Sequence, residues 1–285
     1  MPKVLRWAGY ALAGLFVIVV VAVAGVWAAS ASKLNARVEP RPETLALPTP
    51  AQLADGRRQL RVLGCISCHG ENLEGKAFLD DPQLAMLYAS NLTLVAAKAS
   101  DQQLAAAIRQ GVGHDGRTLL VMPSESYQFL TDQEVSALVS AIRQFPKTGS
   151  DQPPMQLGPI GRFAVATGRL PTIPALAEHY RSSRIADLGP DFSFGRHLVE
   201  TNCSGCHGPD LKGKELDPGT VSADLAMTGS YDLEQFRALL REGVAPGGKK
   251  LGLMASVSKN DFRHLRDDEI AAIHSYLVER AKRAP

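Results

Sequence analysis

The sequence predicts an all-α protein with an N-terminal transmembrane helix followed by two tandem copies of a small helical domain. An uncharged apolar stretch runs from Trp7 to Ser32, one cysteine-containing string occurs twice, and apolar residues recur at helical spacing around each string. A length of 285 residues suits about two domains. The predicted divisions are a transmembrane anchor at 1–33, a Pro-rich tether at 34–50, a first domain at 51–149, a connection at 150–190 and a second domain at 191–285.

The composition is that of a folded protein with no strong charge. Hydrophobic residues make up 45% of the chain and charged residues 21%. Lysine and arginine number 31 against 29 aspartate and glutamate, a net charge of +2, and no run of like charge could follow a phosphate backbone. We therefore expect no nucleic-acid partner.

The first segment is predicted to cross a membrane, because no charged residue occurs over the 26 positions from Trp7 to Ser32. Trp27 lies 20 residues after Trp7, which is about 30 Å along a helix, so the two indoles would reach the two headgroup levels. A cleaved signal peptide is the alternative, with Ala29–Ala31 as the cleavage site. Both interpretations imply export, and the length of the apolar run favours a retained anchor.

The orientation follows from the charges before this segment. Lys3 and Arg6 predict a cytoplasmic N-terminus, with everything after Ser32 on the other side of the membrane. Residues 34–50, which contain four prolines, are expected to act as a semi-stiff tether that lifts the rest off the bilayer. The predicted location is the bacterial inner membrane, crossed once, with both domains in the periplasm.

The four cysteines occur in two copies of a C-x-x-C-H string, Cys65–His69 and Cys203–His207. This string is typical of covalent attachment of a c-type haem. Cysteines three apart on a helical turn project to one side and can each form a thioether with a haem vinyl group, and the adjacent histidine can bind the iron. The sequence therefore predicts two covalently bound haem c groups, attached by Cys65, Cys68, Cys203 and Cys206 with His69 and His207 as iron ligands.

Three other interpretations of the string are less favoured. A redox-active C-x-x-C does not require histidine directly after it in both copies, and disulfides leave the matching histidines unexplained. A zinc site lacks a regular second pair of ligands within each half.

The sixth iron ligands are predicted to be Met122 and Met254. Each methionine stands 11 residues after the glycine of a matched Gly-Val pair, Gly111 in the first copy and Gly243 in the second. A thioether opposite histidine raises the reduction potential of haem relative to an all-nitrogen pair of ligands. His114 is the main rival ligand in the first copy, in a turn-rich string without a histidine counterpart in the second. His264 and His274 compete in the second copy, in or near its closing helix.

Helices are predicted at both ends of each copy. Residues 51–63 and 191–202 lead into the two strings, and closing helices are expected after Thr131 and Arg266, each with an acidic residue in its first turn. Gly56 and Gly195 in the leading helices would let the closing helices cross at short range. The connection at 150–190, with six prolines, is expected to pack along both domains and to hold them relative to each other.

The two halves resemble class I cytochrome c domains. The segment Tyr88–Thr93, together with Met122-Pro123 and Leu130–Asp132, is similar to segments in the haem c subunits of membrane-bound alcohol and sugar dehydrogenases, over roughly residues 51–285. Those subunits commonly carry three haems, whereas this sequence contains two strings.

The predicted function is electron transfer rather than catalysis. We expect a dihaem cytochrome of the respiratory chain that relays single electrons from a dehydrogenase or quinol-oxidising donor to a terminal oxidase or small cytochrome. The protein could be free or a subunit of an oxidoreductase complex. A dihaem peroxidase that reduces hydrogen peroxide is the alternative. It requires one iron with an open or displaceable site, which the two matched methionines disfavour.

Overall fold

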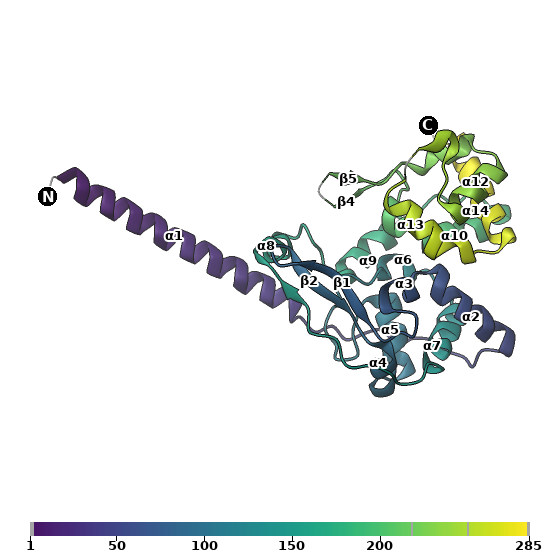
Figure 1. Cartoon of the computed structure of the whole chain (residues 1–285), viewed down its shortest axis with the longest axis horizontal. Coiled ribbons are helices and arrows are strands. Elements are labelled where there is room, and N and C mark those ends of the chain that lie inside the picture. The colour runs from purple at the N-terminus through teal and green to yellow at the C-terminus, as the bar shows by residue number, and fades with distance from the viewer. Residues whose placement is uncertain (1–2, 218, 250, 284–285) are drawn as a thin grey trace.

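The computed structural model describes residues 3–217, 219–249 and 251–283, and these are mainly helical. A long helix, α1 (Lys3–Leu34), projects away from a body in which two helical domains lie against each other (Figure 1). The predicted fold class is therefore confirmed: an N-terminal apolar helix precedes two small helical domains.

Helix α1 is long and apolar enough to cross a membrane, and a signal sequence can have the same length and composition. Its apolar side chains are exposed along the projecting part, including both tryptophans. Only its last turns meet the body, where Leu34 packs against a small cluster formed by Ala85, Leu157 and Val165. The apolar surface of residues 3–25 is thus left uncovered by the rest of the described chain.

The first domain is built from six helices around one apolar core. Side chains of Thr49, Ser100 and Thr131 each accept a backbone N–H at the start of a helix, and the residue three positions later completes a capping box. The closing helix begins directly after Thr131, as predicted. The helices are α2 (Pro50–Val62), α3 (Cys65–His69), α4 (Leu92–Lys98), α5 (Asp101–Gln110), α6 (Ser124–Tyr127) and α7 (Asp132–Arg143).

The second domain repeats this plan. Its core contains Leu198, Phe236, Ile270 and Tyr276, contributed by the leading helix, a middle helix and the closing helix. The α-helices are α10 (Ser193–Asn202), α11 (Ser204–His207), α12 (Leu233–Glu242), α13 (Leu253–Asn260) and α14 (Asp267–Arg283). Short 3-10 helices join them: η1 (Pro190–Phe192), η2 (Leu225–Ser230), η3 (Pro246–Gly248) and η4 (Phe262–His264).

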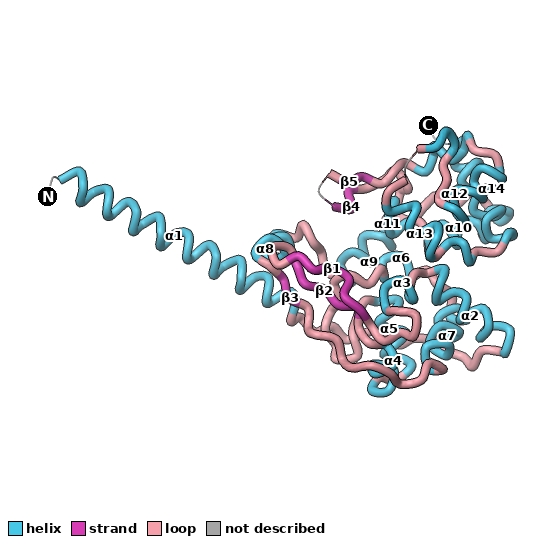
Figure 2. Tube along the Cα trace, viewed as in Figure 1, coloured by secondary structure: helices cyan, strands magenta, loops and turns pink. Residues whose placement is uncertain are grey.

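Two small antiparallel sheets were not predicted from the sequence. Strands β1 (Lys76–Asp81) and β2 (Ala85–Ala89) form a hairpin, and β3 (Gln156–Leu157) pairs with the other edge of β2. In the second domain, β4 (Glu215–Asp217) pairs with β5 (Thr220–Val221). Figure 2 shows both sheets at the side of the body toward α1. They are additions to a helical fold, inserted after each cysteine string.

The connection contains two helices, α8 (Pro159–Thr167) and α9 (Ile173–Ser182). Helix α9 contacts both domains: Gln128 of the first domain donates to Ala177 O at 2.9 Å, and the Tyr180 hydroxyl donates to Ser204 O of the second at 3.2 Å. The expectation that this segment packs along both domains agrees with these contacts.

Residues of the tether lie along the first domain instead of standing free as a spacer. Arg109 donates to the buried Glu43 carboxylate at 2.8 Å, and the Ser136 hydroxyl accepts the backbone N–H of Ala46 at 3.0 Å. The end of α1 is therefore close to the body, and the prolines extend the chain across its surface.

The leading and closing helices cross closely in each domain, as their glycines predicted. A Cβ at Gly56 would lie 2.6 Å from the carbonyl oxygen of Ala137 on α7, and one at Gly195 would collide with Ala272 O on α14. Backbone of one helix therefore packs directly on backbone of the other, at a point where no side chain fits.

Alanine at Gly56 is expected to destabilise the protein by about 1–3 kcal/mol, because the added methyl group forces the two helices apart. The direction of the stability change distinguishes a close crossing from an open one, because alanine in place of glycine inside an unobstructed helix stabilises the protein by about 1 kcal/mol. Urea unfolding of the haem-loaded protein measures the difference. A Gly56→Ala variant as stable as wild type would show that the crossing is looser than the structure indicates.

Candidate functional site

The first cysteine string forms one helical turn, α3, between two glycines. Gly64 precedes it with φ 72°, and Gly70 ends it with φ 90°, so both ends turn sharply in conformations that glycine adopts without strain. Cys65 and Cys68 are part-buried and form no disulfide. Burial raises the pKa of the Cys65 thiol to about 12. Both cysteines and His69 are thus presented from a single short turn.

The imidazole of His69 is oriented by the backbone. Its Nδ1 lies 2.8 Å from the carbonyl oxygen of Ser90, in the segment after β2. A carbonyl oxygen can only accept, so Nδ1 carries the proton and Nε2 presents a lone pair. Burial lowers the pKa of His69, although the bond to Ser90 opposes this, and the neutral imidazole is the form that binds metals.

The second string repeats this geometry. His207 Nδ1 lies 2.7 Å from Ala223 O, and burial lowers the pKa of this imidazole too. The Cys203 thiol, like that of Cys65, has its pKa raised to about 12 by burial. The two sites were predicted as copies of one arrangement, and their histidines have the same orientation relative to the backbone.

The loop after each string is also the same in both copies. Leu73 and Leu211 are the two described non-glycine residues with positive φ, 59° and 61°, and both are fully buried. A leucine in this region costs free energy, so its recurrence marks a loop whose shape is imposed by the site. Gly75 N donates to His69 O at 2.7 Å, and Gly213 N donates to His207 O at 2.9 Å. Each loop thereby holds the end of its histidine turn.

Met122 and Met254 lie in the same domains as the strings they were predicted to serve. Met122 is part-buried and packs against the first core together with Cys65. Met254 packs against the second core together with Cys203, but it lies at the start of α13, whereas Met122 lies in a loop. The structure thus brings each methionine to the apolar core beside its string. Their role as iron ligands stays a prediction.

Two of the three rival histidines are exposed or have a ring nitrogen bonded elsewhere. His114 is exposed in its loop. His274 Nε2 lies 2.8 Å from Tyr231 O, which occupies that nitrogen. His264 is part-buried next to the domain interface, where its carbonyl oxygen accepts from Arg58 at 3.0 Å.

A family model for cytochrome c matches the chain twice, at residues 53–145 and 193–281, which is more than half of its length. The chain belongs to the cytochrome c family. It is therefore a cytochrome c-type electron carrier, and its two family domains imply covalently bound haem c.

Two curated relatives of this cytochrome are subunits of dehydrogenases. The chain is 24% identical over 278 residues to the fructose dehydrogenase cytochrome subunit of Gluconobacter japonicus, covering 85% of this chain and 55% of the relative. It is 25% identical over 263 residues to the gluconate 2-dehydrogenase cytochrome c subunit of Pantoea cypripedii, covering 78% and 58%. The chain thus spans little more than half the length of either relative.

The residues present fit haem c. Each string offers two unpaired thiols and one histidine from the same turn, with the free imidazole nitrogen available to a metal. A methionine, Met122 or Met254, packs against the same core as the first cysteine of each string. This donor set, thiols for attachment and imidazole plus thioether for iron, is that of a c-type haem.

The domain interface contains reciprocal contacts, in which one residue of each string bonds to the other domain. The hydroxyl of Ser126, just before the closing helix of the first domain, lies 3.0 Å from that of Ser204, inside the second string. In return Ser67, inside the first string, donates to Asp261, just before the closing helix of the second domain. Each string therefore has one serine bonded to the other domain.

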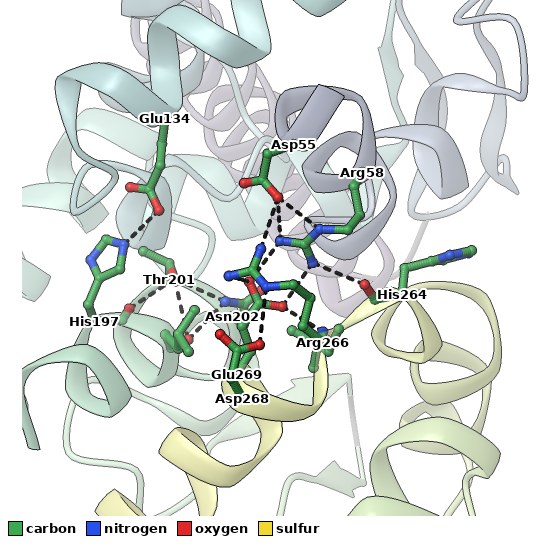
Figure 3. A network of polar contacts seen from close by, with 12 residues as sticks. Asp55, Arg58, Glu134, His197, Thr201, Asn202, His264, Arg266, Asp268 and Glu269 are labelled. Carbon is green, nitrogen blue, oxygen red and sulfur yellow. Dashed lines mark hydrogen bonds and ion pairs between the residues drawn. The ribbon is translucent and has the colours of Figure 1, made fainter. Parts of the chain in front are cut away.

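Two acidic residues at matched positions extend this reciprocity (Figure 3). Glu134 of α7 accepts the backbone N–H of Thr131 at 2.7 Å and contacts His197 of α10 in the other domain at 2.9 Å. Glu269 of α14 contacts Arg58 of α2 in the first domain at 2.7 and 2.8 Å. Each closing helix thus uses its first-turn glutamate to hold the leading helix of the other domain.

The Glu134–His197 pair is expected to make stability depend on pH. Burial lowers the pKa of His197, but the hydrogen bond and charge of Glu134, together with the charge of Glu200, outweigh it and leave that pKa above 6.5. The contribution of the protonated imidazole is therefore complete below pH 6.5 and lost as pH rises through the raised pKa. The pKa of Glu134 is lowered from 4.5 by His197 despite burial, so its contribution is present above pH 4.5 and lost as pH falls through the lowered pKa.

Urea unfolding of wild type and His197→Gln tests this. The stability difference between them should be larger at about pH 5.5 than at about pH 8.5, where the imidazole is neutral. A difference that does not change over this range would show that the pair is not an ion pair in solution.

Sequence reasoning missed three features of the site. The carbonyl oxygens of Ser90 and Ala223 orient the histidines, and no side-chain pattern marks a backbone acceptor. The interface contacts of Glu134 and Glu269 join residues far apart in sequence, and an acidic first turn does not indicate what the side chain bonds to. Glu125 is buried near the interface and burial raises its pKa, but its neighbours in sequence carry no distinguishing motif.

Proposed function

We propose that this protein is a membrane-anchored dihaem cytochrome c that relays single electrons on the periplasmic side of the bacterial inner membrane. Cys65 and Cys68 would attach one haem, with His69 and Met122 as its iron ligands. Cys203 and Cys206 would attach the second, with His207 and Met254. The chain would act as an electron carrier and not as an enzyme.

The observation that carries this proposal is the repetition of the histidine geometry. Each histidine donates a hydrogen bond from Nδ1–H to a backbone carbonyl and so offers Nε2 to a metal, on the same turn as two free thiols. Bound haem supplies a one-electron centre whose iron alternates between two oxidation states. The residues of the chain orient each imidazole, favour its neutral form and bond each string to the other domain.

The arrangement of the domains supports a relay. Ser126 and Ser204 connect the two string-bearing halves directly, and α9 contacts both of them. Two sites on domains that are bonded to each other at several points suit transfer between them without domain movement. An electron donor docked on one domain and an electron acceptor docked on the other would then complete the electron-transfer path.

The donor is proposed to be a dehydrogenase, since the two relatives are cytochrome subunits of fructose and gluconate 2-dehydrogenases. A quinol-oxidising donor is a second option of the same class. A terminal oxidase or a small cytochrome would accept the electrons. The apolar α1, with Lys3 and Arg6 at its start, supports anchoring with the domains outside the cytoplasm.

Replacement of one methionine ligand tests the proposal. Met122→Leu should keep two haems while losing about half of the sulfur-to-iron absorption of the oxidised protein, because one of two thioether ligands is removed. The control is Met86→Leu on β2, since Met86 is part-buried in the same domain but was not predicted as a ligand. An unchanged spectrum in Met122→Leu would contradict the ligand assignment.

Added peroxide separates the relay from the peroxidase alternative. With both irons six-coordinate, the wild-type protein should not turn over hydrogen peroxide. Rapid turnover by wild type would instead favour the enzyme. Quantified haem and the mass of the mature chain give the number of attached groups in the same preparation.

A further inference from the structure

Helix α8 lies beside the last turns of α1, at the junction between the apolar helix and the body (Figure 1). The guanidinium of Arg162 lies 3.8 Å from the ring centroid of Trp27 and donates to the hydroxyl of Ser30 at 3.1 Å. The Lys33 ammonium donates to the carbonyl oxygens of Val165 and Ala166, both at 3.0 Å. These contacts fix α8 alongside residues 27–33.

The contact with Trp27 sets the height of α8 relative to a bilayer. Trp27 lies 20 residues after Trp7, about 30 Å along the helix, and so at a headgroup level if α1 spans the membrane. Because Arg162 covers the Trp27 ring, the turn of α8 around residue 162 lies at that same level.

One face of α8 is apolar and uncovered. Ile160 is 55% exposed and Phe163 is 44% exposed, and at a spacing of three residues they share a side of the helix. The opposite side is closed: Gly161 and Val165 are buried, and a Cβ at Gly161 would collide with Leu84 O. The helix is therefore packed against the turn between β1 and β2, with its two largest apolar side chains turned outward.

Basic residues surround this face. Lys33, Arg37 and Arg169 are exposed near the end of α1 and the end of α8, and Arg162 is half-buried between the two helices. Large apolar side chains flanked by cations are the composition of a helix that lies in the interface of a bilayer containing anionic lipid.

We propose that α8 is an interfacial membrane helix, with Ile160 and Phe163 inserted at the headgroup level of the bilayer that α1 crosses. This inference rests on the proposed anchoring by α1. A second contact beside the first prevents the body from rotating about the axis of α1, so the two string-bearing domains would present one fixed side to partners in the same membrane.

Spin labels on the full-length, haem-loaded protein in lipid nanodiscs containing phosphatidylglycerol test this placement. A nitroxide on Phe163→Cys should collide with molecular oxygen more readily than with a water-soluble nickel complex. The nickel collision rate should be severalfold lower than at the control, Phe194→Cys. Phe194 is also 46% exposed and lies on α10, in the second domain. A label on Ile160→Cys gives an independent second measurement should the label at 163 disturb the helix.

A label on Val19→Cys, in the middle of α1, separates the two hypotheses. If position 19 is protected from nickel while positions 160 and 163 are as accessible as 194, the interfacial helix is overturned and the anchor is retained. If position 19 is itself open to nickel, the anchor and the interfacial helix are both overturned. Protection at 19, 160 and 163 together supports the inference.

Discussion

Serine at both Cys65 and Cys68 is expected to yield a mature protein whose mass is lower by one haem, with the second haem still attached. Serine cannot form the thioether bonds, and His69 alone does not hold haem covalently. The first domain should also lose structure, because haem would supply much of the apolar interior of a domain of this size. Hydrogen exchange over residues 51–149 should then be much faster than in wild type.

The mirror variant is the control. Cys203→Ser with Cys206→Ser should remove the other haem and accelerate exchange over residues 191–285, while the first domain stays protected. Retention of both haems in the first variant would refute the attachment sites. Native-like protection of residues 51–149 without haem would refute the structural dependence while leaving attachment itself intact.

Methionine at Arg58 is expected to destabilise the protein by about 3 kcal/mol, because it leaves the Glu269 carboxylate buried without its main partner. The Glu269 side chain is 2% exposed and contacts Arg58 through both oxygens, at 2.7 and 2.8 Å (Figure 3). Arg266 also reaches Glu269, at 3.1 Å, which limits the loss. Urea unfolding of the haem-loaded protein measures the effect.

Arg61→Met on the same helix is the matched control. Its partner Glu71 is 70% exposed, and a solvated pair of this kind contributes about 1 kcal/mol or less. A double-mutant cycle with Glu269→Gln then isolates the coupling between Arg58 and Glu269. Equal losses in Arg58→Met and Arg61→Met would mean that the interface does not depend on this pair.

The closing helices show how far local pattern reasoning extends. Thr131 followed by Glu134 predicted the start of α7, and the capping box lies there. The same glutamate also contacts His197, which is 63 residues away in sequence. Capping depends on neighbours along the chain and was predictable. The second contact depends on how two domains dock, which no helical periodicity encodes.

The strands illustrate a different limit. Residues 76–81 include Lys76, Asp80 and Asp81, so they lack the alternation of apolar and polar residues that marks a half-buried strand. The hairpin is held by its pairing with residues 85–89 and by the short strand from the connection. Its third strand lies about seventy residues further along the chain, beyond the range of any local signal.

Some features can be recognised from short stretches of sequence. These are the paired strings, the glycines at the helix crossings and the apolar first helix. Spacing therefore predicted the candidate attachment residues, and composition predicted the long apolar first helix, whereas the family was predicted from a resemblance and shown by the family match. The tertiary structure decided three other features: the orientation of His69 and His207, the contacts of Glu134 and Glu269 with the other domain, and the position of α8 against Trp27. Each of these joins groups distant in sequence, and only the packing of the folded chain brings such groups within bonding distance.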